Sequence, residues 1–233
     1  MSRGKLLVLE GLDGSGKATQ TELLEKALRE RGHRVRKISF PNYGSPSSSL
    51  VKMYLRGDFG SEPGDVNAYA ASAFFAVDRY AGMKQDWGRF YEEGGILLAD
   101  RYATSNAVHQ CCKLERGAWD GYLDWLFHFE YEQLGIPEPD GVVFLRVSLE
   151  DSQQLMTQRY HGDNSRKDIH ERDLAYLETA HEAAEYCVKK YHWLPVDCVS
   201  REKEDGERSV LHLRDRMSIA QDVLALAEEI LQL

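Results

Sequence analysis

The chain lacks any apolar run of membrane-spanning length, and its first residues enter a strand-like segment without the pattern of a secretion signal. Basic residues are in the minority, because 29 lysines and arginines face 38 aspartates and glutamates, for a formal net charge of −9. No basic run interrupts this excess of acid. We therefore expect neither a membrane partner nor a nucleic-acid partner, since the latter requires a positive surface.

Cysteine is also scarce, with four residues in 233. Cys111 and Cys112 are adjacent, which suits neither a zinc site nor an easy disulfide geometry, and Cys187 and Cys198 stand apart. Reduced thiols and a cytoplasmic location are the expectation. The chain also lacks internal repeats and low-complexity segments, so residues 1–233 are most simply one α/β domain.

What the chain does contain is a glycine-rich segment between a short apolar run and a helical pattern. Residues 6–9 are apolar as in a buried strand, residues 21–31 carry a helical stripe, and G-x-x-x-x-G-K lies between them. Glycines let backbone N–H groups surround a phosphate, while the helix N-terminus and the lysine add positive charge. A tight glycine turn is the alternative. We interpret the segment as a phosphate loop for a nucleoside triphosphate, formed by Gly11, Asp13, Gly14, Ser15, Gly16, Lys17, Ala18 and Thr19.

One position departs from the usual pattern of such loops. Ala18 occupies the place where Ser or Thr would ligate Mg²⁺. Thr19 is no simple replacement, because one helical step turns a side chain by about 100°. Mg²⁺ is therefore expected to be held through water, phosphate oxygens and carboxylates elsewhere, with Asp13 and Asp100 as the candidate ligands.

Strand and helix patterns alternate along the chain. After residues 6–9, further strands are predicted at 33–40, 96–99, 141–147 and 196–199. Helices are predicted at 50–55, 67–83, 119–134, 149–159 and 168–191, with helical sequence at 210–233. This alternation predicts a three-layer α/β/α P-loop kinase fold around a five-stranded parallel sheet. A basic, glycine-bearing stretch at about 159–171 is interpreted as a lid loop, with a solvated loop as the alternative.

Two further groups of residues suggest an anion site. Phe75 and Arg79 are four apart, so they share one face of the helix at 67–83, although a core phenylalanine beside a surface arginine would look the same. Asp100 and Arg101 end the third strand. Arg101 would be costly at a buried strand end unless it paired with an anion.

Together these motifs resemble thymidylate kinase. The residues that carry the resemblance are the phosphate loop from Glu10 to Lys17, Phe40-Pro41, Phe75 to Arg79, Asp100-Arg101-Tyr102 with Ser105-Asn106, and the lid. Their order and spacing match the family from about residue 5 to residue 191. The resemblance implies transfer of the γ-phosphoryl group of ATP to dTMP, giving dTDP and ADP in deoxythymidine nucleotide synthesis, with Mg²⁺ bound to ATP.

The resemblance also implies roles for individual residues. Lys17 and the loop amides would hold the ATP phosphates, Asp13 would contact the 3′-hydroxyl, and Arg101 with Arg79 would grip the phosphate of dTMP. Phe75 would stack on thymine. The residues assigned to dTMP are Asp13, Phe40, Phe75, Arg79, Arg101, Ser105, Asn106 and His109, the last of which stands where some members carry a tyrosine.

The family differs in the position of its catalytic arginine, which lies in either the phosphate loop or the lid. Gly14-Ser15 leaves this phosphate loop without an arginine, so the chain resembles the lid-arginine type. Arg159 and Arg166 then join Lys17 and Arg101 as the predicted catalytic residues. Their role would be to neutralise charge on the transferred group.

Two other interpretations remain open at this point. The chain could be a kinase for a different nucleoside monophosphate or for a deoxynucleoside, or a nucleotide-binding switch, which Ala18 favours. Two arginines aimed at the acceptor favour a monophosphate kinase. The family further implies a homodimer packed through helices such as the one bearing Phe75 and the aromatic helix at 119–134.

Overall fold

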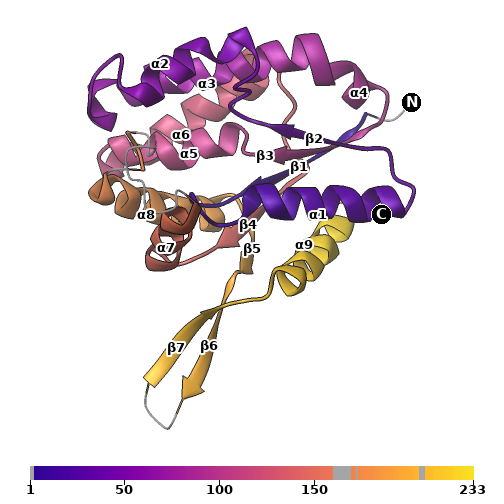
Figure 1. Cartoon of the computed structure of the whole chain (residues 1–233). Helices are drawn as coiled ribbons and strands as arrows, with labels where there is room; N and C mark the ends of the chain where they lie inside the picture. The colour runs from indigo at the N-terminus through magenta and orange to yellow at the C-terminus, as the bar shows by residue number, and fades with distance from the viewer. Residues whose placement is uncertain (1–2, 160–168, 172, 205–207) are drawn as a thin grey trace.

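The computed structural model describes residues 3–159, 169–171, 173–204 and 208–233. At its centre is a five-stranded parallel sheet with the strand order β2-β3-β1-β4-β5 (Figure 1). The strands are β1 (Lys5–Glu10), β2 (Val35–Ser39), β3 (Ile96–Asp100), β4 (Gly141–Arg146) and β5 (Leu194–Asp197). The predicted sheet is confirmed.

Strand β1 is central, which explains its unbroken apolar sequence. It pairs with β3 on one side and β4 on the other, so both faces of its residues 6–9 are covered and all four side chains are fully buried. The register places Leu9 opposite Asp100 and also opposite Val143. Consequently the phosphate loop after β1 and Arg101 after β3 emerge at the same edge of the sheet, where ligands bind in open α/β folds.

Helices cover both faces of the sheet, which confirms the three-layer arrangement. On one face, α1 (Lys17–Glu30) and α9 (Arg216–Leu231) pack against Leu7, Leu9 and Leu98. On the other face, side chains such as Trp87, Tyr122 and Ala180 pack against Leu6, Val8 and Leu97. The helices of this second layer and beside it are α2 (Ser49–Arg56), α3 (Ala68–Gly82), α4 (Gly88–Glu92), α5 (Ala103–His109), α6 (Trp119–Phe127), α7 (Leu149–Arg159) and α8 (Leu174–Lys190).

Two of the predicted helices end in π-helical turns. Helix α3 runs into a π-turn at Met83–Trp87, and α6 runs into another at His128–Gln133. A π-turn inserts an extra residue and so rotates the side chains that follow it. In the second turn Glu130 is fully buried, pointing toward the interior from a helix whose neighbouring residues are largely aromatic.

The predicted helix at 168–191 begins too early. Residues 169–171 form a turn, and α8 begins at Leu174 after Asp173, whose side chain accepts a hydrogen bond from the Tyr176 amide at 3.0 Å. The reason is tertiary, because the Ile169 amide donates to the carbonyl of Leu55 in α2 at 3.4 Å. Most of the predicted lid, residues 160–168, lies outside the described residues.

The C-terminal region differs most from the prediction. The strand predicted at 196–199 is β5 at Leu194–Asp197, an edge strand that tolerates Pro195. Residues 210–213, predicted as helix, belong to β7 (Arg208–Leu213), which pairs with β6 (Val199–Glu204) in an antiparallel hairpin that projects from the body of the molecule (Figure 1). The predicted helix forms only after Asp215, whose carboxylate caps α9 by accepting hydrogen bonds from the amides of Met217 and Ser218.

None of the helices in the described ranges is both long and apolar enough to cross a bilayer.

Candidate active site

The phosphate loop joins β1 to α1 as the sequence predicts. Gly14 and Gly16 adopt φ values of 82° and 87°, in the left-handed region that glycine enters without a steric cost. Lys17 begins α1, and its buried ammonium donates to the carbonyls of Gly11 at 2.7 Å and Leu12 at 2.8 Å. Burial lowers the pKa of Lys17 to about 8, and the nearby charge of Arg101 acts in the same direction. The loop therefore holds a desolvated cation at the edge of the sheet.

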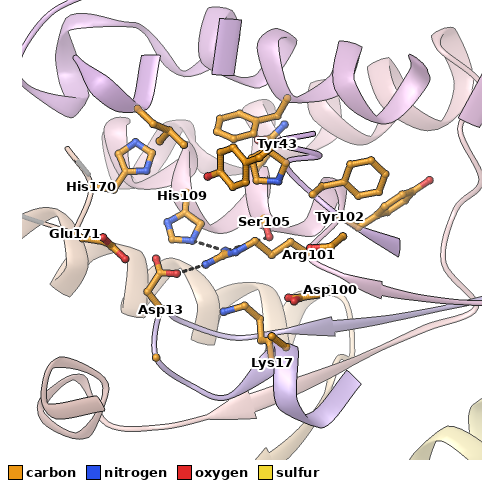
Figure 2. Close-up of a pocket in the computed structure, with 18 of the residues that line it drawn as sticks. Asp13, Lys17, Tyr43, Asp100, Arg101, Tyr102, Ser105, His109, His170 and Glu171 are labelled. Carbon is orange, nitrogen blue, oxygen red and sulfur yellow. Dashed lines mark hydrogen bonds and ion pairs between the residues drawn. The ribbon is translucent and has the colours of Figure 1, made fainter. Parts of the chain in front are cut away.

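Arg101 is the second cation of the site. It follows β3 with a φ of 67°, which is uncommon for a residue with a Cβ and is typical of functional positions. Its guanidinium forms an ion pair with Asp13, and its Nη1 donates to His109 Nε2 at 3.1 Å. Figure 2 shows Arg101 reaching between Asp13 and His109, with Lys17 and Asp100 nearby.

The charges of the site fix two protonation states. Burial would raise the pKa of Asp13, but the charges of Arg101 and Lys17 outweigh burial and hold that pKa below its usual value. Burial lowers the pKa of His109 to about 3, and Arg101 adds to this effect. Because Arg101 can only donate, a neutral His109 must accept at Nε2 and carry its proton on Nδ1.

Glu10 lies beside the predicted site residues, but the sequence did not predict a role for it. It ends β1, is almost fully buried, and accepts hydrogen bonds from the hydroxyls of Thr104 at 2.8 Å and Ser105 at 2.7 Å. Its second oxygen accepts from the Gly11 amide at 3.1 Å and lies 3.9 Å from Arg101 Nη1. Glu10 thus ties the phosphate loop to helix α5 and to Arg101. The feature of the sequence that could have indicated Glu10 is a carboxylate at the end of an apolar strand.

Arg79 is held by a different carboxylate. It is buried and forms an ion pair with Glu130, with a distance of 2.8 Å from Nε to Oε2. Asn106 donates to the same carboxylate at 3.1 Å, and Arg79 Nη1 donates weakly to the carbonyl of Tyr102 at 3.4 Å. Burial by itself would lower the pKa of Arg79, but the charge of Glu130 outweighs burial and raises the pKa of Arg79. Glu130, also missed from the sequence, has its signal in the aromatic helix, where an acidic residue interrupts the apolar face.

The predicted residues converge on one cavity of about 1400 Å³. The predicted residues that line it are Asp13, Gly14, Gly16, Lys17, Ala18, Thr19, Phe40, Phe75, Arg79, Asp100, Arg101, Ser105, Asn106 and His109. Gly11 and Ser15 of the loop are not part of this lining but pack closely against each other, since a Cβ on Gly11 would lie 2.6 Å from the Ser15 hydroxyl. Arg166 and the side chain of Arg159 lie outside the described part of the chain, so their predicted roles stay predictions.

Several lining residues were not predicted. Lys52, Leu55 and Arg56 come from α2, and Arg216 from the start of α9. By contrast, His170 and Glu171 belong to the end of the predicted lid stretch, and they complete the wall beside His109, as Figure 2 shows. Within the described ranges, no group of three or more His, Cys, Asp or Glu side chains could hold a metal ion.

The cavity therefore combines a phosphate loop with a separate arginine held by carboxylates. Such a pair of anion sites at one sheet edge suits a reaction between two phosphate groups, in which positioning and charge neutralisation carry the chemistry.

Comparison with known proteins identifies similar chains. A family model described as thymidylate kinase matches residues 9–209. The thymidylate kinase of Mycobacterium tuberculosis is 34% identical over 172 residues, which cover 72% of this chain and 78% of that protein. The human thymidylate kinase is 32% identical over 151 residues, which cover 64% of each chain. A solved structure of thymidylate kinase from Candida albicans superposes with a TM-score of 0.64 at 22% identity, covers 100% of this chain and 93% of that chain, and supports the fold.

Proposed function

This chain belongs to the thymidylate kinase family, and we propose that the cavity at the carboxyl edge of β1 and β3 is where it transfers the γ-phosphoryl group of ATP to dTMP, giving dTDP and ADP. The observation that carries the assignment of the site is the presence of two cations in one cavity: Lys17 begins the helix after β1, and Arg101 lies in the connection from β3 to α5. One cation serves the donor and the other the acceptor.

The phosphate loop forms the donor half. Its amides and the N-terminus of α1 favour negative charge, and Lys17 adds a full positive charge at the same place. When ATP binds, Lys17 exchanges the carbonyls of Gly11 and Leu12 for phosphate oxygens, and it stays protonated there because an anion raises a lysine pKa. Ala18 and Thr19 complete the loop without supplying a metal ligand.

Arg101 defines the acceptor half. A guanidinium matches the geometry of a phosphate through two parallel hydrogen bonds, and Asp13, His109 and Ser105 already restrict its orientation. Phe75 is proposed to stack on thymine, Ser105 and Asn106 to contact its edge, and Phe40 to close the wall. Arg79 has its Nε and Nη2 engaged by Glu130, so its help in gripping dTMP would come through Nη1.

The residues present fit Mg²⁺ bound with ATP. Mg²⁺ retains waters and binds one or two carboxylates together with substrate phosphates, so it does not need a cluster of protein ligands. Asp100 is buried, lines the cavity and is the better candidate, because Asp13 is already paired with Arg101. Mg²⁺ would neutralise charge on the phosphates of ATP. Arg159 and Arg166 are proposed to neutralise charge on the transferred group.

A homodimer is part of this proposal. Tyr69, Val77 and Tyr80 of α3 are exposed, and Tyr69 packs edge-on against Trp125 of α6 with ring centroids 4.6 Å apart. An exposed apolar face shared by two helices is typical of an interface. Light scattering should give twice the chain mass.

We also propose a cytoplasmic location, which agrees with the four cysteines being free thiols.

The first test is an ADP-release assay with ATP and Mg²⁺ that offers dTMP, dUMP, UMP, CMP, AMP, GMP and thymidine in parallel. Strongest activity with dTMP and none with thymidine is expected, because Arg101 needs an acceptor phosphate. Preference for another monophosphate would reject the roles of Phe75 and Asn106. Folded protein that binds ATP but phosphorylates none of these acceptors would contradict the function itself.

A further inference from the structure

Residues 169–171 dock on helix α2 beside the acceptor half of the cavity. The Ile169 amide donates to the carbonyl of Leu55, and the Ile169 side chain packs with Tyr54 and Ala71. His170 and Glu171 are both buried, and both line the cavity. Part of the cavity wall is therefore built by a short turn that is anchored to α2.

A chain of hydrogen bonds fixes His170 in this wall. Lys113 donates to the carbonyl of Val66 at 2.9 Å and to the hydroxyl of Tyr54 at 2.6 Å, and that hydroxyl lies 2.6 Å from His170 Nε2. A lysine ammonium can only donate, so the oxygen of Tyr54 accepts from Lys113. The Tyr54 hydroxyl can then donate to His170 Nε2 when the imidazole ring is neutral and that nitrogen carries no proton. Burial favours the same state, since it lowers the pKa of His170 well below the usual value.

Tyr54 also contacts the ring that is proposed to stack on thymine. Its ring meets Phe75 at a perpendicular angle, with centroids 6.3 Å apart, and His170 at 5.3 Å. His170 in turn stacks on Tyr176 at 4.6 Å and faces His109 at 5.9 Å. One side chain thus supports both the base-stacking ring and the wall next to it, while neither Tyr54 nor Lys113 lines the cavity.

We infer that Tyr54 and Lys113 are positioning residues for the acceptor, which act through His170 and Phe75 to set the wall against which the nucleoside of dTMP binds. The inference rests on the proposed function. It predicts a selective effect, because the hydrogen bonds from Lys113 through Tyr54 to His170 lie against the acceptor wall, whereas Lys17 in the donor half is held by the carbonyls of Gly11 and Leu12. Removing the Tyr54 hydroxyl takes away the hydrogen bonds that Lys113 and His170 make to it at a buried position, which costs more than the loss of an exposed hydrogen bond.

The test uses two conservative variants of the full chain. Tyr54→Phe keeps the ring against Phe75 and removes the hydroxyl, while Lys113→Met keeps the apolar stem and removes the donor. Either change should raise KM for dTMP about five- to tenfold, the effect of one lost hydrogen bond, while kcat and KM for ATP stay within about twofold. The double variant should raise KM for dTMP no further than the more impaired of the two single variants does, because both changes break the same chain of hydrogen bonds.

Tyr186→Phe is the matched control. It removes a tyrosine hydroxyl that bonds to Asp120 on the surface, away from the cavity, and should leave both KM values unchanged. Equal loss toward both substrates, an unchanged KM for dTMP, or additive effects in the double variant would overturn the inference. If Tyr54→Phe does not fold, Lys113→Met decides alone. Absence of dTMP phosphorylation in the wild-type protein would instead reject the proposed function.

Discussion

At the scale of single residues, the site is a set of buried charges that balance one another. Lys17 and Arg101 are cations, Asp13 and Glu10 are the anions next to them, and His109 is kept neutral between them. A buried charge without a partner is costly, so each carboxylate both stabilises and orients an arginine or lysine. In the proposed function, Lys17 and Arg101 are the two cavity cations that would meet phosphate.

Arg101→Ala should impair use of dTMP selectively. Loss of a charge-assisted two-point contact with the acceptor phosphate is expected to lower kcat/KM for dTMP by about 10²-fold or more. KM for ATP should change little, because the phosphate loop keeps Lys17. Steady-state kinetics with each substrate varied in turn provides the measurement. Arg89→Ala, at an exposed arginine on α4, is the control; equal losses toward ATP and dTMP would contradict the role of Arg101.

Glu130→Gln should destabilise the protein strongly. The change keeps the shape of the side chain but leaves the buried guanidinium of Arg79 without its counter-charge, which typically costs about 3–5 kcal/mol. Urea unfolding monitored by circular dichroism gives the difference in free energy. Glu93→Gln is the matched control, since Glu93 pairs with Arg34 and Arg89 at the solvent-exposed surface and its loss should cost much less. Similar small losses in both variants would show that the Arg79 pair is not structural.

At the scale of elements, short connections decide where the side chains of the site lie. The left-handed glycines of the phosphate loop place Lys17 at the start of α1, and the unusual φ of Arg101 places its side chain beside that loop. The π-turn after α6 brings Glu130 inward to meet Arg79 and Asn106. Each of these local irregularities serves the cavity, whereas the regular parts of the helices form the core.

Asp215→Ala tests an element boundary that the helical pattern alone placed wrongly. Asp215 caps α9 through the amides of Met217 and Ser218, so its loss should cost about 1 kcal/mol of unfolding free energy. The cost should appear in global unfolding, because α9 packs against α1 and the sheet. Asp222→Ala, in the exposed middle of α9, should cost less. Thermal denaturation of both variants makes the comparison, and a smaller loss in Asp215→Ala would contradict the assigned cap.

At the scale of the whole molecule, the fold places two layers of helices around a sheet and leaves one edge for chemistry. The parallel register of β1 and β3 brings Glu10 and Asp100 to that edge, and α5 and α2 close it from the second layer. Stability and function are coupled here, because the buried side chains of Lys17, His109 and His170 line the cavity and their burial disfavours the protonated form.

Mild acid should therefore destabilise the protein before its carboxylates titrate. The folded protein holds the pKa of His109 at about 3 and that of His170 well below its usual 6.5, so the unfolded chain binds more protons below that value. Unfolding free energy should fall by about 1.4 kcal/mol per pH unit for each such histidine between about pH 6 and pH 4. The lowered pKa values of Lys17 and Lys113, at about 8, make stability depend on pH only above that value, where it should rise as the folded lysines lose their protons.

Urea midpoints measured from pH 7 to pH 4 provide the check. His109→Asn should be less stable at neutral pH but should show a shallower loss on acidification, because one titrating group is gone. A slope unchanged by this substitution would mean that His109 does not titrate on unfolding in this range.

The sequence by itself determined the regular elements and the identity of the chemistry. Apolar runs, glycine positions and helical stripes are local signals, so β1, the phosphate loop, α1 and the Asp100-Arg101-Tyr102 turn were all predictable. The residues assigned to ATP and dTMP largely converge on one cavity for the same reason, since parallel strands deliver their ends to one edge.

Only the tertiary structure decided which charged residues meet. Glu10 bonds to Thr104 across 94 positions, Arg79 to Glu130 across 51, and Tyr54 to His170 across 116. No local period encodes such pairs, because they depend on how distant elements pack. The same cause explains the late start of α8, where residues 169–171 dock on α2, and the strand β7, where pairing with β6 outweighed the helical pattern.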